Sequence, residues 1–316
     1  MTNADPLMVD FDLQSLEGRY TLVEDFYVRD HGPIPSLLGT NVLEIEGEVE
    51  NPRRISIDEL QSLPTRELGA ILECAGNPVG TLGKVSNGLW KGWALTDVLA
   101  LAQPAHSASF LHLFGRDDYA RSVPLERASS DAMLATHLNG RPLDRHHGMP
   151  WRALFPGWYG MDSVKWLERI VVSKAALPSN DNAYLELTKG PSGEIVQQPL
   201  PRIQVKSVIL GPAQGSVLHR GRVKVHGLAW SGEGKITSVE VKCDKDPAWH
   251  PATLGTGLGY EWASWQSELE ISQPGAVEIG CRAADEKGST QPAERDPKRL
   301  DGYVENWYHR VRIVLV

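Results

Sequence analysis

Cys74 is the residue of this sequence best suited to metal chemistry. It stands in the stretch "AILECAGNPVG", after the apolar residues Ile71 and Leu72 and before an Ala-Gly-Asn turn. A buried strand would therefore deliver the thiol to a tight turn that opens on a cavity. A thiolate binds soft or high-valent metals when its pKa is lowered and an apolar wall keeps water out. From these neighbours alone the alternatives stay open, because a structural thiol at the end of a buried strand is common.

A second group of residues could hold an anion. The stretch 138–170, "LNGRPLDRHHGMPWRALFPGWYGMDSVKWLERI", concentrates basic side chains among Pro and Gly residues in an otherwise acidic protein. Arg152 offers a bidentate fork, Lys165 a point charge, His147 a ring donor and Ser163 a hydroxyl, so a ligand that bears a phosphate is the natural candidate. The alternative is a solvated charged loop.

A third group lies in "DFYVRDHGPIP", residues 25–35. Arg29 and His31 are two positions apart, so on an extended segment they face the same side. Pro33 and Pro35 restrict the chain that follows. Arg29 and His31 on one face can bind an oxyanion. The alternative is that this segment is a surface loop without a ligand.

The elements that must position these residues change in type along the chain. Up to about residue 175, short strand-like runs alternate with helical stretches such as "SIDELQSL" and "LTDVLALA", where Ser56 and Glu59 have the spacing of a capping box. From about residue 203, short alternating runs separated by Gly, Pro, Asp and Ser turns predict an antiparallel β-sandwich. Residues 176–202 are rich in turn formers and read as an ordered linker. We therefore predict two domains, 1–202 and 203–316.

Cys243 and Cys281 each end a predicted strand of the second domain. No Cys-x-x-Cys spacing occurs, so the sequence does not indicate a zinc ribbon or a thioredoxin-like redox pair. We expect both to be reduced core thiols rather than a disulfide between sheets.

Composition and charge limit the class of protein. The chain has 316 residues, 41% of them hydrophobic, and a formal net charge of −8, which is the wrong sign for a general nucleic-acid binder. The first residues show no basic segment followed by an apolar one, and no run of about 18 apolar residues occurs. We expect a cytoplasmic protein that binds neither nucleic acid nor a membrane.

The motifs, in their order, resemble those of the sulfite oxidase family of molybdenum enzymes. The resemblance runs from about residue 25 to the end of the chain. It rests on Arg-Asp-His in "FYVRDHGPIP", "CAGN", "NGLWKGWALTDVL", the block "HGMPWRALFPGWYGMDSVKWL", and then "VHGLAWSGEG", "CRAADEKGSTQP" and "NWYHRVRI". It implies an α+β protein: a mixed α/β molybdopterin-binding domain followed by an Ig-like β-sandwich that forms a homodimer.

The resemblance also implies the site residues. One molybdopterin per chain would carry molybdenum, with Cys74 as its only side-chain ligand, and Arg29 would orient the substrate, with Arg310 in "YHRVR" as a second catalytic residue. The pterin and its phosphate would be held by Tyr27, Arg29, His31, Asp117, His147, Arg152, Ser163, Val164 and Lys165.

The sequence departs from the family pattern near the expected substrate. Pro78 and Val79 follow "CAGN" where typical sulfite oxidases have two arginines, Thr136 replaces an active-site tyrosine, and Asp30 replaces an asparagine beside Arg29. Losing a cationic contact to a desolvated anion costs about 2–5 kcal/mol of binding. Efficient oxidation of the sulfite dianion is therefore in question.

Three functions follow from the resemblance and its departures. The first is oxygen-atom transfer on a small sulfur-containing substrate as in sulfite oxidases, with Arg29, Arg310, His137 or Lys91 as compensating cations. The second is a sulfoxide reductase or sulfane-type dehydrogenase that acts on a less charged substrate. The third is an inactive dimeric binding or scaffold protein. We expect no haem or flavin in this chain, and no NAD because the sequence lacks a Gly-x-Gly-x-x-Gly motif in a strand-turn-helix setting. Electrons would pass to oxygen, to a separate carrier protein or to the substrate itself.

Overall fold

The structure is a computed structural model that describes residues 7–37, 42–128, 131–177 and 184–316. The chain forms two compact units, and each unit is made of three segments that alternate with those of the other along the sequence. The first comprises Met1–Phe11, Gly18–Cys74 and Lys84–Ala183, and the second comprises Asp12–Glu17, Ala75–Gly83 and Tyr184–Val316. Cys74 is thus the last residue of one segment of the first unit.

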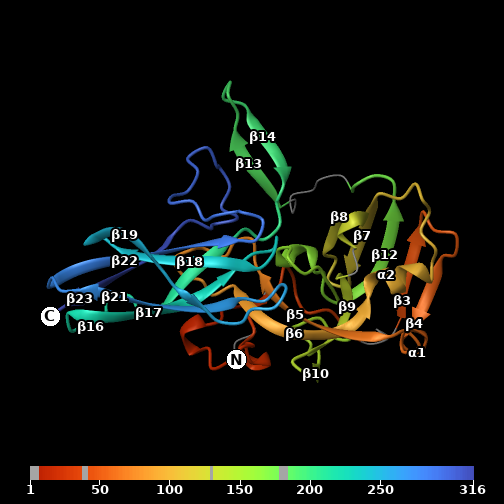
Figure 1. Cartoon of the computed structure of the whole chain (residues 1–316). Helices are drawn as coiled ribbons and strands as arrows, with labels where there is room; N and C mark the ends of the chain where they lie inside the picture. The colour runs from red at the N-terminus through yellow and green to blue at the C-terminus, as the bar shows by residue number, and fades with distance from the viewer. Residues whose placement is uncertain (1–6, 38–41, 129–130, 178–183) are drawn as a thin grey trace. The chain divides into compact units, whose positions relative to one another are not determined.

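The first unit contains two five-stranded sheets (Figure 1). One has the order β10-β9-β6-β5, with β11 also paired to β9: β5 (Thr65–Glu73), β6 (Val85–Ala94), β9 (Met133–Leu138), β10 (Arg141–Pro142) and β11 (Arg152–Leu154). The other has the order β4-β3-β12-β7-β8: β3 (Val42–Gly47), β4 (Arg53–Ser56), β7 (Phe110–Gly115), β8 (Ala120–Pro124) and β12 (Leu167–Ser173). A further pair joins β1 (Met8–Val9) to β2 (Val28–Arg29).

One apolar core holds this unit together. Side chains from both sheets and from the short helices α1 (Ile57–Leu60) and α2 (Leu95–Ala100) pack in a single cluster. The predicted capping box is confirmed, because the Ser56 hydroxyl accepts from the Glu59 N–H while the Glu59 carboxylate accepts from the Ser56 N–H. Both predicted helical stretches are therefore helical, although short.

The second unit is a sandwich of two sheets, as predicted (Figure 1). One has the order β15-β17-β21-β20: β15 (Lys206–Gly211), β17 (Gly221–Trp230), β20 (Thr253–Leu254) and β21 (Ala263–Ile271). The other has the order β16-β23-β22-β18-β19: β16 (Val217–Leu218), β18 (Ile236–Cys243), β19 (Asp246–Pro251), β22 (Gly275–Asp285) and β23 (His309–Leu315). The pairing is antiparallel except between β16 and β23.

Alternating apolar residues of the two sheets form the core of the sandwich. Val223 and Val225 on β17 belong to the same buried cluster as Val239 and Val241 on β18. Cys243 and Cys281 lie in this core as free thiols, which confirms that prediction, and burial raises the pKa of Cys281 to about 12.

The segment interpreted as a linker contains a β-hairpin. Strands β13 (Leu185–Lys189) and β14 (Ile195–Pro199) pair around a turn that contains Gly193, whose φ of 91° favours glycine. Figure 1 shows the hairpin standing away from the two sheets of its own unit. Backbone hydrogen bonds from Lys189 to Lys298 and from Leu300 to Leu187 tie it to the C-terminal part of the chain. These partners are distant in sequence, so the composition of the turn alone did not indicate them. The domain boundary predicted at residue 202 lies after the end of this hairpin.

Within the described residues, no helix is both long enough and apolar enough to cross a membrane.

Candidate functional site

Cys74 lies where strand β5 gives way to a loop. Its backbone N–H donates to the Lys84 carbonyl at 2.9 Å, which closes the loop at its base. Glu73 is 0% exposed and Ala75 is 2% exposed, whereas Cys74 is only partly buried. The strand and loop thus bury both neighbours, whereas Cys74 stays partly exposed.

Tyr27 lies beside the strand end that carries Cys74. Its backbone N–H donates to the Ser86 hydroxyl at 3.1 Å. A Cβ atom at Gly160 would lie 2.9 Å from the Tyr27 hydroxyl and 3.4 Å from the Glu73 carbonyl oxygen. Gly160 therefore permits a close approach of three segments that are far apart in sequence, and only glycine fits at that position.

Arg29 and His31 flank the buried Asp30. Strand β2 ends at Arg29, whose guanidinium donates to the Asp30 carbonyl at 2.6 Å. The His31 ring stacks on Tyr119, with ring centroids 4.5 Å apart. Partial desolvation in this stack, together with the positive charges of Arg29 and Lys165, lowers the pKa of His31. The imidazole is therefore biased toward its neutral form.

Asp117 occupies the turn between β7 and β8. Its carboxylate accepts a long hydrogen bond of 3.4 Å from the Tyr119 N–H, and burial raises its pKa. A Cβ atom at Gly115 would lie 2.6 Å from this carboxylate and 2.8 Å from the Lys165 carbonyl oxygen. The turn is thus packed against the segment that contains Lys165.

His147 is held between two acceptors. Its Nδ1 lies 2.9 Å from the Asp144 carboxylate and its Nε2 lies 3.3 Å from the Phe26 carbonyl oxygen. Burial raises the pKa of Asp144, but the hydrogen bond and charge of His147 outweigh it and lower that pKa to about 2.

Arg152 is a buried cation that the protein compensates only in part: burial lowers its pKa more than the charges of Tyr27 and Asp30 raise it. The side chain is 4% exposed, and its guanidinium donates to the carbonyl oxygens of Ser163 at 2.6 Å and His147 at 3.4 Å. No carboxylate of the described residues forms an ion pair with it. Burial lowers its pKa to about 10. A buried charge without a counter-ion is unfavourable, so the site suits an anionic ligand.

Lys165, by contrast, has a partner within the protein. Its ammonium group forms a buried ion pair with Asp30 and donates to the His146 carbonyl at 3.0 Å. Burial lowers the Lys165 pKa to about 8, an effect that Asp30 opposes. The second carboxylate oxygen of Asp30 is buried and has no hydrogen-bond partner. The sequence analysis did not foresee this pair, because the two residues are 135 positions apart.

Ser163 and Val164 belong to a rigid turn. The Ser163 hydroxyl accepts from the Phe155 N–H at 3.1 Å, and the Val164 carbonyl accepts from the Ala153 N–H at 2.9 Å. The fully buried Asp162 fixes the turn through ion pairs with Arg121 at 2.7 Å and Arg127 at 2.5 Å. Asp162 has a structural role that the sequence did not reveal.

The structure gathers the predicted cofactor residues in the first unit, where the contacts above link them. Arg310 belongs to the second unit, on β23. Its guanidinium donates to Glu294 at 2.7 Å and to the Ala293 carbonyl at 3.0 Å. Its charge is thus paired within that unit, and its catalytic role stays a prediction.

Lys91 lies on β6 and His137 on the neighbouring β9, both distant from the end of β6 that is close to Cys74. They face each other on β6 and β9, and the Thr136 hydroxyl contacts both His137 Nδ1, at 2.8 Å, and the Lys91 carbonyl, at 3.2 Å. Val85 is the β6 residue opposite Glu73. Positions 85 to 91 correspond to roughly 20 Å of extended strand, which argues against these two cations as substitutes for the missing arginines.

The comparisons with known proteins agree with this arrangement. Residues 31–180 match the oxidoreductase molybdopterin-binding domain and residues 197–315 match the Mo-co oxidoreductase dimerisation domain. The chain is 31% identical to the mitochondrial sulfite oxidase of Drosophila melanogaster, covering 95% of this chain and 60% of that protein, and 32% identical to the sulfite oxidase of Gallus gallus, covering 91% and 71%. The chain therefore spans about 60–70% of the length of these relatives.

A solved structure extends the likeness to the fold. The sulfane dehydrogenase SoxCD from Paracoccus pantotrophus superposes with a TM-score of 0.83 at 28% identity, covering 94% of this chain and 81% of that chain. This two-unit, strand-rich protein has the two domains that molybdopterin-dependent oxidoreductases combine. More narrowly, the chain belongs to the sulfite oxidase family.

The residues present fit a molybdopterin cofactor. Arg152 is a buried cation without a counter-ion, as a phosphate group requires, and the unpartnered Asp30 oxygen can accept from a ring N–H. Cys74 is partly exposed. No group of three or more His, Cys, Asp or Glu side chains among the described residues could hold a metal ion. A metal at Cys74 would thus take its remaining ligands from the cofactor or solvent.

Proposed function

We propose that this protein transfers an oxygen atom to or from a small sulfur-containing substrate at a molybdenum centre held by Cys74. The observation that carries the proposal is the combination, in one unit, of a partly exposed cysteine next to a strand end and a buried Arg152 that forms no ion pair with a carboxylate of the described residues. When it is bound, the molybdopterin cofactor would supply a molybdenum that exchanges two electrons and an oxygen atom with the substrate. The protein supplies position, charge and exclusion of water.

The side chains divide the work of holding this cofactor. Arg152 and Ser163 offer donors to its phosphate, His147 borders the same site with its ring nitrogens bonded to Asp144 and Phe26, and the Asp30 carboxylate accepts from its ring system. Tyr27, His31, Asp117, Val164 and Lys165 shape the walls, through the contacts described above. Because Asp144 holds His147 by Nδ1, the ring orientation is fixed before the ligand arrives.

We propose a substrate less charged than sulfite. The Val79 side chain is buried and apolar where the family has an arginine, and Asp30 neutralises Lys165. Arg29 is the remaining cation of the motif that faces the substrate in sulfite oxidases. Reduction of a neutral sulfoxide consumes two electrons and two protons and releases water, so it requires no dianion in the pocket. Oxidation of a sulfane-type sulfur, the activity named for the Paracoccus relative, is the second candidate.

Partners and location are also proposals. The match of residues 197–315 to a dimerisation domain supports a homodimer through an Ig-like second domain. Electrons would pass to or from a separate carrier protein, and the complex named in the Paracoccus structure supports such a partner. We further propose a cytoplasmic location. Light scattering of the purified protein and fractionation of expressing cells test the dimer and the location.

The test of the activity is a substrate panel on protein purified with one molybdenum per chain. We expect kcat/KM for neutral sulfoxides or sulfane-type substrates to exceed that for sulfite at least tenfold. A higher value for sulfite would show that the missing arginines are compensated. Stoichiometric metal with no turnover of any sulfur compound would favour the inactive scaffold.

A further inference from the structure

The loop that follows Cys74 is held by one backbone group and two side chains from the C-terminal part of the chain. Residues Ala75–Gly83 group with the second unit, although Cys74 itself belongs to the first. The Ala75 carbonyl accepts from the Val304 N–H at 2.8 Å, and the Asn77 carbonyl accepts from the Lys206 ammonium at 3.3 Å. The Val79 N–H donates to the Glu305 carboxylate at 3.0 Å. Residues 75, 77 and 79 of the loop are therefore each hydrogen-bonded to a later segment of the unit to which the loop belongs.

The loop needs these partners because it is buried. Ala75, Asn77 and Val79 are all less than a tenth exposed, and a buried backbone group without a hydrogen bond is costly. Lys206, at the start of β15, is itself buried, with its ammonium 5.9 Å from the centre of the Trp230 ring. Water cannot solvate the ammonium group of a lysine that is so deeply buried. The hydrogen bond to the Asn77 carbonyl therefore helps to satisfy this ammonium group.

The local sequence makes the side-chain anchors necessary. Pro78 has no N–H and Val79 has no polar side chain, so neither side chain can hydrogen-bond to fix the turn. Within the loop, the Leu82 N–H donates to the Pro78 carbonyl at 3.1 Å, and Leu82 has a φ of 53°. The short turn is thus defined by its own hydrogen bond, while residues 75, 77 and 79 are held by bonds to Val304, Lys206 and Glu305.

We propose that Glu305 and Lys206 are positioning residues for Cys74: they fix the loop to which the cysteine is joined and so set where its sulfur points. The inference rests on the proposed function of Cys74 as metal ligand. The position of a metal ligand is set by groups beyond the ligand itself, and their loss alters the metal's properties even when the ligand remains. Neither residue contacts the substrate in this account.

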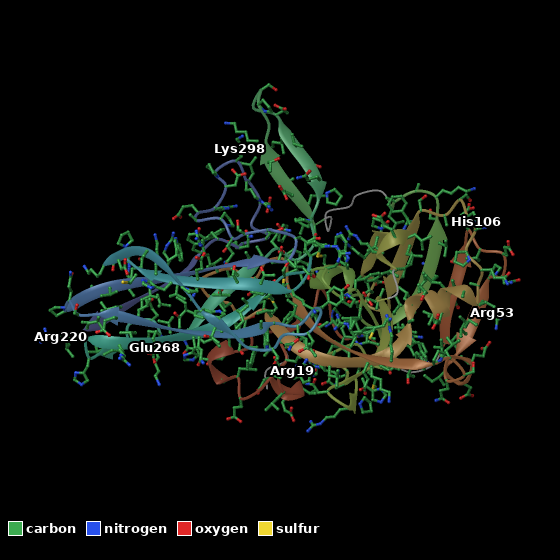
Figure 2. The ribbon with its side chains drawn as sticks, in the orientation of Figure 1. Arg19, Arg53, His106, Arg220, Glu268 and Lys298 are labelled. Atoms are coloured by element: carbon green, nitrogen blue, oxygen red, sulfur yellow. The ribbon has the colours of Figure 1, made fainter. Side chains whose placement is uncertain are left out.

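The test compares Glu305→Ala with Glu305→Gln. Alanine removes the acceptor of the Val79 N–H, whereas glutamine keeps an acceptor oxygen at the same place. Loss of a buried hydrogen bond costs about 1–3 kcal/mol, so hydrogen exchange at Val79 should quicken about tenfold or more in cofactor-free Glu305→Ala. Reaction of Cys74 with a neutral maleimide should change in the same variant. Lys206→Met is a second disruptive variant, and Glu268→Gln, on the exposed side of β21, is the matched control (Figure 2).

In the metal-loaded enzyme, we expect Glu305→Ala to shift the Mo(V) electron paramagnetic resonance signal and to lower kcat with little change in KM, and Glu305→Gln to restore both. An unchanged Val79 exchange rate and an unchanged Mo(V) signal in Glu305→Ala would overturn the inference. So would equal effects of alanine and glutamine. Because exchange and thiol reactivity are measured without cofactor, absence of molybdenum in the wild type would count against the proposed function alone.

Discussion

Lys165 and Asp30 form a buried ion pair between two segments that we predict to surround the cofactor. The pair changes the electrostatics of the site, because one of its two deeply buried cations is already neutralised by the protein. Arg152 is then the cation that most needs an external anion. This division between a paired lysine and an unpaired arginine leads to opposite expectations for mutations at the two positions.

Asp30→Asn should destabilise the cofactor-free protein strongly. Removing one partner of a buried pair leaves Lys165 uncompensated, at a cost of about 3–5 kcal/mol. In the loaded protein a phosphate nearby would offset part of that cost, so the loss should be smaller. Denaturant unfolding of both forms measures the difference. Glu46→Gln, which breaks an exposed pair with Arg169, should cost under about 1 kcal/mol. Equal losses with and without cofactor would contradict a nearby anion.

Arg152→Met should have the reverse effect. Cofactor retention should fall at least tenfold, because the phosphate loses its buried cation. The free energy of unfolding of the cofactor-free protein should change by only about 1–2 kcal/mol, since removal of an uncompensated buried charge offsets the lost bonds to carbonyl oxygens. Molybdenum per chain after gel filtration and denaturant unfolding are the two measurements. Normal metal content in this variant would exclude Arg152 from the cofactor site.

The Asp144–His147 pair should appear in the pH dependence of stability. The folded-state pKa of Asp144 is about 2, below its ordinary value, so the pair stabilises the fold above about pH 4 and this contribution is lost as pH falls toward 2. Because the Asp144 side chain is 43% exposed, we expect about 1 kcal/mol after screening by solvent. The stability difference between wild type and Asp144→Asn should therefore shrink between pH 5 and pH 2. A difference that stays constant over that range would be inconsistent with the lowered pKa.

The sequence predicted those parts of the protein that local patterns determine. The alternation in "GRVKVHGLAW" and "ITSVEVKC" correctly indicated β17 and β18, and the Ser56–Glu59 spacing correctly indicated a helix start. The apolar run before Cys74 correctly indicated strand β5, which ends at Glu73, next to the partly buried Cys74.

The remaining features depend on contacts between distant residues, which no local pattern reveals. The pairing of Lys165 with Asp30, the closure of β13 against Leu300 and the anchoring of Val79 by Glu305 all join residues more than 100 positions apart. Asp144 and His147 are only three positions apart, but the sequence analysis did not identify this pair either.

The most direct test of the account is X-ray absorption at the molybdenum edge on wild-type protein and on Cys74→Ala, each expressed in a molybdenum-replete host. We predict one molybdenum per wild-type chain and one sulfur ligand fewer in Cys74→Ala, with turnover abolished and the fold retained. Cys243→Ala, which removes a core thiol, should keep the wild-type sulfur count. An identical number of sulfur ligands in wild type and Cys74→Ala, or full activity in Cys74→Ala, would contradict the assignment of Cys74 as the metal ligand.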